Sequence, residues 1–298
     1  MRIPTFCLYA SPVGRGRACA AAADEEPGSD CGLTVESPSG SQAFPLSSGY
    51  NSATLPLSVS SNCIGTQATW VFDFSYTSSS GTTYQAGEAT TTTTLGQSTN
   101  WQSPAGVGGQ GNVTVTASVT GATAPPTTTL QCYIDRTTIP NSAITSQLVG
   151  LYSGATPALL TGIAWRESSY QQFVSRSAYS VSGLWPNESS GGGYVGLMQV
   201  PNAMNVAFDW TQNAAASATV FQQKVSKSQS VVSGYQASCK GLPGLTGTQL
   251  ENDALVYYGS YAGSGPYYVP NTNCTGWITN PNNSNGVSYA NSVRADIQ

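Results

Sequence analysis

The stretch Thr-Pro-Ala-Leu-Leu-Thr-Gly-Ile-Ala-Trp-Arg-Glu-Ser-Ser-Tyr, residues 156–170, predicts a helix that carries an acid into the core. Pro157 lies in the first turn, where backbone N–H groups have no partner within the helix, so its missing N–H costs nothing. Leu160, Ile163 and Glu167 follow at helical spacing, so Glu167 lies on the apolar stripe of this helix. Burial disfavours an ionised carboxylate and raises its pKa, which suits a general acid working near neutral pH.

An alternative interpretation is that Glu167 is an ordinary surface residue, because a lone Glu near a helix end is usually solvated or salt-bridged. Arg166 is adjacent in the sequence but about 100° away around the helix, so it is no obvious partner for the carboxylate. The motifs that accompany Glu167 favour the buried acid over this alternative.

Four further stretches accompany the Glu167–Ser168 pair. They are a helical segment at 144–152 with Gln147, Leu148 and Leu151, Gly-Leu-Met-Gln at 196–199, Phe-Asp-Trp-Thr-Gln-Asn at 208–213, and Ala-Leu-Val-Tyr-Tyr-Gly-Ser-Tyr-Ala-Gly at 254–263. In this order the stretches resemble the lysozyme-like domain of lytic transglycosylases, the soluble-lytic-transglycosylase or goose-type lysozyme superfamily. The resemblance covers roughly residues 140–270, a little under half of the chain.

The resemblance implies a mainly α-helical lysozyme-like domain that cleaves the peptidoglycan of bacterial cell walls. In this family a single glutamate protonates the glycosidic oxygen between N-acetylmuramic acid and N-acetylglucosamine. The glutamate then takes the proton of the C6 hydroxyl of the sugar, which leaves a 1,6-anhydro end and requires no cofactor or metal. Carried over to this sequence, the catalytic acid is Glu167, and the expected substrate-binding residues are Ser168, Gly196, Met198, Gln199 and Tyr261.

The chain departs from the family pattern in two places. Its Tyr-Asn-x-Gly turn lacks the Asn, so Tyr257, Tyr258 and Tyr261 compete as the tyrosine that contacts the catalytic acid. The segment after Glu167 is long and contains Glu188, a plausible second acid for the two-carboxylate mechanism of most glycosidases. A hydrolysing muramidase and a non-catalytic cell-wall-binding protein are therefore alternatives to a transglycosylase.

Several candidate residues also have plain structural interpretations. Asp209 can cap a helix that begins at Trp210, and Glu251 and Asp253 are expected at the start of a later helix, where carboxylates favour the helix dipole. The remaining alternatives are core packing for Met198, a helix cap for Ser168, a buried turn for Tyr261, and covering of the core rather than stacking on sugar rings for Trp185 and Tyr194.

Composition excludes several classes of function. The chain has 298 residues, of which only 8% are charged, and no histidine. The absence of histidine excludes Ser-His-Asp and Cys-His catalysis and most zinc sites. A formal net charge of −4 without a basic tract argues against nucleic acid as a partner. The sequence has no apolar run of about 18 residues, so no membrane span is expected, and the predicted enzyme is a monomer acting on glycan strands.

The seven cysteines form no Cys-x-x-Cys pair. Their spacing suggests the disulfides Cys63–Cys132 and Cys239–Cys274, which would place the protein outside the cytoplasm, secreted or in the cell envelope. The alternative is a set of free or buried thiols. Residues 1–32 are expected to be a disordered leader or a degenerate signal, because their basic pair follows the short apolar segment instead of preceding it.

The hydrophobic periodicity changes near Asp135 from two to 3.6 residues, which predicts two domains. We expect an all-β, immunoglobulin-like sandwich at 33–135, with Trp70, Phe72 and Phe74 on one strand face, acting as a spacer or wall-binding module. The lysozyme-like domain is expected at 136–275, and a C-terminal tail at 276–298. Helices are predicted at 144–152, 157–170, 210–233 and 248–258, and loop and turn over 264–298.

Overall fold

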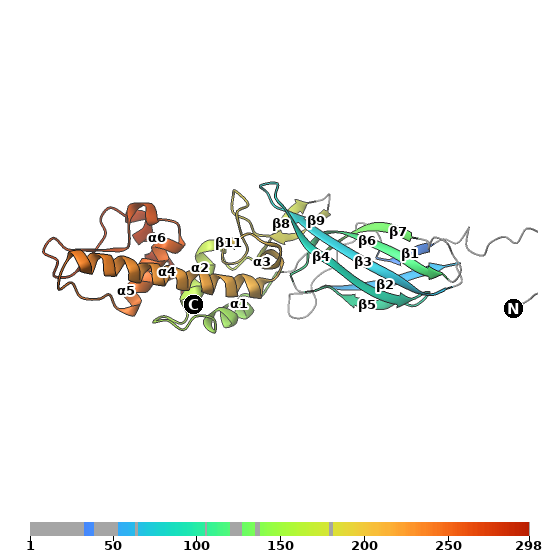
Figure 1. The fold of residues 1–298 in the computed structure, drawn as a ribbon, viewed down its shortest axis with the longest axis horizontal. Helices are drawn as coiled ribbons and strands as arrows, with labels where there is room; N and C mark the ends of the chain where they lie inside the picture. Colours follow the sequence, from blue (N-terminus) through green and yellow to red (C-terminus); the bar gives the residue numbers. More distant parts are fainter. Residues whose placement is uncertain are drawn as a thin grey trace, which may run out of the picture.

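The computed structural model describes residues 33–38, 53–62, 65–104, 106–119, 127–134, 138–178 and 181–297. The molecule is elongated, with the large sheets at one end and the long helices at the other (Figure 1). The expected leader over residues 1–32 and the expected pairing of Cys63 with Cys132 lie outside the described residues.

The strands that precede the first helix form two antiparallel sheets in the described part of the chain. The smaller sheet has the order β1-β2-β5, and the larger has the order β4-β3-β6-β7. Threonine, valine and aromatic residues are frequent in these strands, as expected for a half-buried pleated surface. The strands are β1 (Leu33–Ser37), β2 (Thr54–Ser61), β3 (Gly65–Thr77), β4 (Thr83–Thr94), β5 (Thr99–Gln102), β6 (Gly109–Val119) and β7 (Thr127–Ile134).

Alternate side chains of β3 form the core of this region. Trp70, Phe72, Phe74 and Tyr76 are at most 1% exposed, which confirms the prediction that the first three share one strand face. The ring of Phe72 stacks on Trp101 of β5, with ring centroids 3.9 Å apart. Because β3 and β5 belong to different sheets, this stack ties the two sheets together.

The expected fold class, an immunoglobulin-like sandwich followed by a mainly α-helical lysozyme-like domain, is wrong. The fold is mixed, because strands recur between the helices of the second part of the chain. Three two-stranded antiparallel sheets pair β8 (Phe173–Ala178) with β9 (Val181–Pro186), β10 (Tyr194–Val195) with β11 (Val200–Pro201), and β12 (Tyr268–Pro270) with β13 (Trp277–Thr279). Four of these strands, β10 to β13, have only two or three residues, which is too few for an alternating pattern.

The helices of the described residues are α1 (Asn141–Val149), α2 (Leu159–Ser168), α3 (Met204–Phe208), α4 (Trp210–Ser238), α5 (Gly247–Tyr258) and α6 (Ser284–Ala295), with a 3-10 turn at Ala262–Ser264. The four predicted helices correspond to α1, α2, α4 and α5. The carboxylate of Asp209 accepts hydrogen bonds from the N–H groups of Thr211 and Gln212 and so caps α4 as predicted. Within the described ranges, no helix is long and apolar enough to cross a bilayer.

Helix α6 corrects the prediction of loop and turn over residues 264–298, and the segment expected to be a tail is part of the fold. Its buried side consists of Gly286, Tyr289, Ala290 and Val293, and its exposed side is rich in Ser and Asn. Such a composition is typical of a loop, but packing against α2 and α5 overrides the weak helix propensity.

A close approach of α6 to α2 depends on Gly162. A Cβ atom at this position would lie 2.2 Å from the carbonyl oxygen of Val293, a contact that no larger residue tolerates without movement of the backbone. The backbones of the two helices therefore lie in contact at Gly162, which brings the side chains of α6 next to the end of α2.

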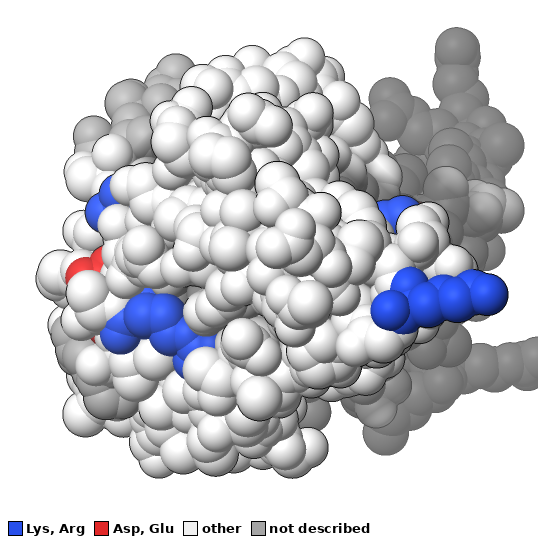
Figure 2. Space-filling model, turned by 90° about the vertical axis from the view of Figure 1, so that its left-hand side faces the viewer, with Lys and Arg blue, Asp and Glu red and all other residues white. Residues whose placement is uncertain are grey.

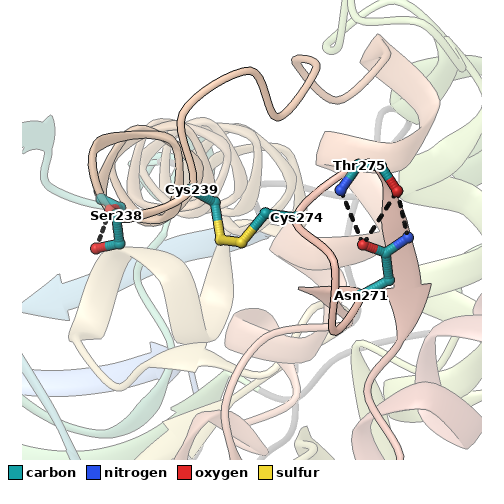
Figure 3. Close-up of a disulfide and its surroundings, with 6 residues drawn as sticks. Ser238, Cys239, Asn271, Cys274 and Thr275 are labelled. Carbon is teal, nitrogen blue, oxygen red and sulfur yellow. Dashed lines mark hydrogen bonds between the residues drawn. A yellow bond between two sulfur atoms is a disulfide. The ribbon is translucent and has the colours of Figure 1, made fainter.

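The predicted disulfide between Cys239 and Cys274 is present (Figure 3). Cys239 follows the last residue of α4, and Cys274 lies in the turn between β12 and β13. In the same turn Asn271 accepts a hydrogen bond of 2.9 Å from the N–H of Thr275. The disulfide thus fastens the β12–β13 hairpin to the far end of the long helix.

Candidate active site

Glu167 is the penultimate residue of α2, and its side chain is half-buried. Leu160 and Ile163 on the same stripe are fully buried, so the predicted inward face of the helix is confirmed. Burial raises the pKa of the Glu167 carboxyl, and a hydrogen bond from Tyr289 and the charge of Arg166 oppose this rise only in part. The carboxyl group therefore keeps its proton to a higher pH than a free Glu.

Tyr289 of α6 holds this carboxyl group. Its hydroxyl donates a hydrogen bond to Oε1 of Glu167, which leaves Oε2 as the oxygen that can present a proton to a ligand. The ring packs against the end of α5, where a Cβ on Gly259 would lie only 2.8 Å from it. Sequence reasoning missed Tyr289 because its segment resembles a loop and lies 122 residues from Glu167.

Tyr258 and Tyr261, two of the three tyrosines expected to contact the acid, form no hydrogen bond to its carboxyl group in the described part of the chain. The hydroxyl of Tyr258 donates a hydrogen bond of 2.8 Å to the carbonyl oxygen of Met198. Burial and the nearby Glu167 raise the pKa of Tyr258. Tyr261 is 39% exposed, and the centroid of its ring lies 5.5 Å from that of Tyr289. Tyr261 therefore borders the site but does not hold the carboxyl group.

Residues 196–199 form a tight turn that two buried amide side chains hold in place. Gly196 has a φ of +81°, and a Cβ there would lie 2.3 Å from Nδ2 of Asn213, so the position requires glycine. Oε1 of Gln172 accepts a hydrogen bond of 2.7 Å from the N–H of Leu197, and Oδ1 of Asn213 accepts one of 3.0 Å from the next N–H. Asn213 ends the 208–213 motif, so this contact gives the motif a structural role.

Ser168 and Met198 join this turn to the rest of the site. The hydroxyl of Ser168 donates to the carbonyl oxygen of Leu197 at 2.7 Å and accepts from the N–H of Gln171 at 3.1 Å. The side chain of Met198 is fully buried, and its carbonyl oxygen accepts the bond from Tyr258. These contacts favour the structural interpretation of Ser168 and Met198 over direct contact with a substrate.

Gln199 is the polar side chain of this turn that solvent reaches. It is half-buried, has a φ of +46°, and its side-chain NH2 donates to the carbonyl oxygens of Asn187 at 3.1 Å and Gly196 at 2.9 Å. These two hydrogen bonds from the NH2 group fix the plane of the Gln199 amide. The amide oxygen of Gln199 can then accept a hydrogen bond from an N–H group of a ligand. Of the two aromatic residues considered for sugar stacking, Trp185 is 1% exposed and Tyr194 is 50% exposed, so only Tyr194 offers a ring face.

Glu188, the possible second acid, bonds to the strand part of the molecule. Its Oε2 accepts a hydrogen bond of 2.9 Å from the N–H of Ser79, in the turn between β3 and β4. Burial raises the pKa of Glu188, and the bonds from Ser79 and Asn202 oppose that rise. The contact with Ser79 therefore occupies Oε2 of Glu188 with a structural hydrogen bond.

Glu251 and Asp253 are buried beyond the first turn of α5, so the prediction that they favour the helix dipole is wrong. Burial alone would raise the pKa of Glu251. Hydrogen bonds from Thr156, Arg294 and Tyr152 outweigh the effect of burial, so the pKa of Glu251 is lowered.

The pKa of Asp253 is shifted in the opposite direction. Burial raises it to about 6, although hydrogen bonds from two backbone N–H groups oppose the rise. Burial and the charge of Asp253 raise the pKa of Tyr257 to about 12, so the third expected tyrosine adjoins Asp253.

Charges over residues 138–297 are unevenly exposed. Asp209, Glu251 and Asp253 are at most 4% exposed, whereas Arg166, Lys227 and Lys240 are exposed. Viewed from the helical end, the surface is largely uncharged, with several basic patches and little acidic surface (Figure 2). Among the described residues, no group of three or more His, Cys, Asp or Glu side chains is placed to hold a metal ion.

The site therefore consists of a half-buried acid at the end of α2, a tyrosine of α6 that holds it, and a glycine turn that presents one amide side chain. Two of the expected residues supply reactive or binding groups: Glu167 has a carboxyl group with a raised pKa, and Gln199 has an oriented amide group. Gly196 shapes the turn, Ser168 and Met198 support it, and Tyr261 lies at its border. No protein-family model and no curated protein matches the chain.

Proposed function

We propose that the chain is a peptidoglycan-cleaving lytic transglycosylase with Glu167 as its single catalytic carboxyl group. One observation carries the proposal: the Glu167 carboxyl is buried enough to raise its pKa, while Tyr289 occupies only Oε1. A general acid must be protonated near the working pH and must keep one oxygen for its substrate. The order of the motifs around Glu167 supplies the substrate class.

In the proposed reaction, the proton on Oε2 of Glu167 passes to the glycosidic oxygen between N-acetylmuramic acid and N-acetylglucosamine. The bond from that oxygen to the anomeric carbon of the muramic sugar then breaks. The Glu167 carboxylate accepts the proton of the C6 hydroxyl of the same sugar, and the C6 oxygen bonds to the anomeric carbon. The proton balance of Glu167 is restored, and Tyr289 stabilises the carboxylate between the two steps. The amide oxygen of Gln199 accepts the N–H of an acetamido group.

The contacts of Glu188 support this single-carboxylate mechanism over a hydrolysing muramidase. Its Oε2 bonds to Ser79, so Glu188 is not disposed like a carboxylate that activates water. Glu167 forms no ion pair with a Lys or Arg of the described residues, so its carboxyl group is not held in the ionised form by a basic partner. We also propose an extracytoplasmic location for a monomeric enzyme, which the Cys239–Cys274 disulfide supports.

The test is cleavage of purified peptidoglycan by the parent and by Glu167→Gln, with product analysis. The amide cannot donate the proton, so we expect activity to fall by about 10²–10⁴-fold. Glu88→Gln, at an exposed acid of β4, is the matched control and should retain parent activity. An anhydro-sugar end supports a transglycosylase, and a reducing end indicates a hydrolysing muramidase. Activity retained by Glu167→Gln contradicts the assignment, and a parent that binds without cleaving is a wall-binding protein.

A further inference from the structure

We infer that Glu188 is a positioning residue through which the β3–β4 turn holds Gln199, so that the strand part of the molecule belongs to the active site. The inference rests on the proposed function of Glu167 and deepens it. It replaces the expectation that the strand part is a detachable spacer or wall-binding module. Three sets of contacts carry it.

The first set fixes the β3–β4 turn itself. Its ends are joined by a hydrogen bond of 2.9 Å from the N–H of Ser78 to the carbonyl oxygen of Thr82. The N–H of Gly81 closes the turn by donating to the carbonyl oxygen of Ser78 at 2.9 Å. The N–H of Ser79 is thereby aimed out of the turn, and it donates to Oε2 of Glu188 at 2.9 Å.

The second set presses the turn against the segment that contains Glu188. A Cβ on Gly192 would lie 2.8 Å from the backbone nitrogen of Ser80, so the two backbones touch. The side chain of Asn202 donates to the carbonyl oxygen of Gly192 at 2.9 Å and lies close enough to Glu188 to oppose the rise in the pKa of its carboxyl group. Nearby, the ring of Tyr76 packs edge to face against Phe208, with centroids 5.3 Å apart.

The third set links Glu188 to Gln199 through the neighbouring residue, Asn187. The carbonyl oxygen of Asn187 accepts a hydrogen bond of 3.1 Å from the side-chain NH2 of Gln199 and one of 2.6 Å from the N–H of Gly196. Glu188 itself forms a β-bridge with Val195, directly before that glycine. A shift of Glu188 therefore displaces the acceptor that orients the Gln199 amide.

The alternative role of Glu188 is that of a second catalytic acid or base. The two roles differ in what a glutamine at this position can do. The oxygen of a glutamine side chain still accepts the N–H of Ser79, but an amide cannot exchange a proton with a substrate or water. Glu188→Gln therefore preserves a positioning role and abolishes a catalytic one.

The experiment measures kcat and KM on a soluble muropeptide for the parent, Glu188→Ala, Glu188→Gln and Gln199→Ala, and for the double variant Glu188→Ala/Gln199→Ala. We expect Glu188→Ala to lower kcat/KM by about tenfold, mainly through KM, because a displaced binding group weakens substrate positioning. Glu188→Gln should stay within about threefold of the parent. The double variant should have the same kcat/KM as Gln199→Ala, because both substitutions remove the same interaction of the Gln199 amide with the substrate. Glu88→Ala, an exposed acid of the same sheet, is the control.

Gly192→Ala provides an independent perturbation, because its Cβ would press on the turn, and its φ of +63° strains the backbone, without removing any polar group. It should reproduce the rise in KM, which keeps the test valid if thermal melting shows that Glu188→Ala is unfolded. The inference is overturned if Glu188→Ala behaves like the parent, if Glu188→Gln is as inactive as Glu188→Ala, or if the effects at Glu188 and Gln199 add. Glu167→Gln in the same series distinguishes a failure of this inference from a failure of the proposed function, because the activity of this variant tests the proposed function alone.

Discussion

Replacing Tyr289 with Phe removes one hydroxyl oxygen and leaves the ring in place. The ring is 8% exposed and packed against the end of α5, so the variant should fold. The lost interaction is a hydrogen bond to the carboxylate of Glu167, and such bonds to charged groups contribute about 1.5–3 kcal/mol. At about 1.4 kcal/mol for each factor of ten, kcat/KM at the optimum should fall by about 10- to 100-fold.

The pH profile gives the sign of the effect. The bond from Tyr289 favours the ionised form of Glu167 and lowers its pKa, in opposition to burial. Without this bond, the pKa of Glu167 rises further, and the alkaline limb of kcat/KM, which reports loss of the proton from the acid, moves to higher pH. Initial rates on a soluble muropeptide from about pH 4 to about pH 9 measure both effects. Tyr261→Phe, whose hydroxyl does not bond to Glu167, should leave the limb unmoved.

The reasoning is refuted if Tyr289→Phe has the alkaline limb of the parent and a rate within about twofold of it. It is also refuted if Tyr261→Phe moves the limb as far as Tyr289→Phe does. A melting curve of each variant separates a loss of positioning from a loss of folded protein.

Three predictions concern the scaffold. Gly162→Ala, whose Cβ meets backbone at 2.2 Å, should cost about 1–3 kcal/mol in denaturant unfolding and reduce activity, whereas Gly234→Ala, with open space around it, should be neutral or stabilising. The pKa of Asp253 is about 6, so stability should fall by about 3 kcal/mol as the pH rises from its usual value near 4 to 6, and Asp253→Asn should remove this dependence in melting curves. Replacing Cys239 and Cys274 by Ser opens a loop with a sequence separation of 35, and unfolding titrations should show a loss of about 4 kcal/mol; an unchanged midpoint would contradict the contribution of the disulfide.

The parts of the fold that sequence could predict are those governed by local periodicity. The stripe with Leu160 and Ile163 is long enough to indicate α2 and the inward position of Glu167. The cap at Asp209 is equally local, because its partners are two and three residues away. The alternation in β3 placed its aromatic residues on one face for the same reason.

The remaining parts depend on contacts between distant segments. Nothing in the sequence near Tyr289 indicates that it meets Glu167, because the packing that brings them together depends on the small size of Gly162 and Gly259. The role of Asn213 was hidden in the same way: the motif that ends with it was visible, but its bond to the 196–199 turn is a tertiary contact. The mixed character of the fold was missed because hairpins as short as β10–β11 carry no periodic signal.

In the helical part Asp209, Glu251 and Asp253 are buried whereas Arg166, Lys227 and Lys240 are exposed, so positive side chains are the more frequent charges on its surface although the whole chain has a formal net charge of −4. Exposed positive side chains of this kind attract anionic polymers toward the end shown in Figure 2 before any specific contact forms. Salt at physiological concentration screens such attraction over about 8 Å, so the encounter rate with an acidic glycan should decline as ionic strength rises, while the proposed chemistry at Glu167 should stay unchanged. If the proposed function holds, the placement of the charges thus separates how the protein meets its substrate from how it acts on it.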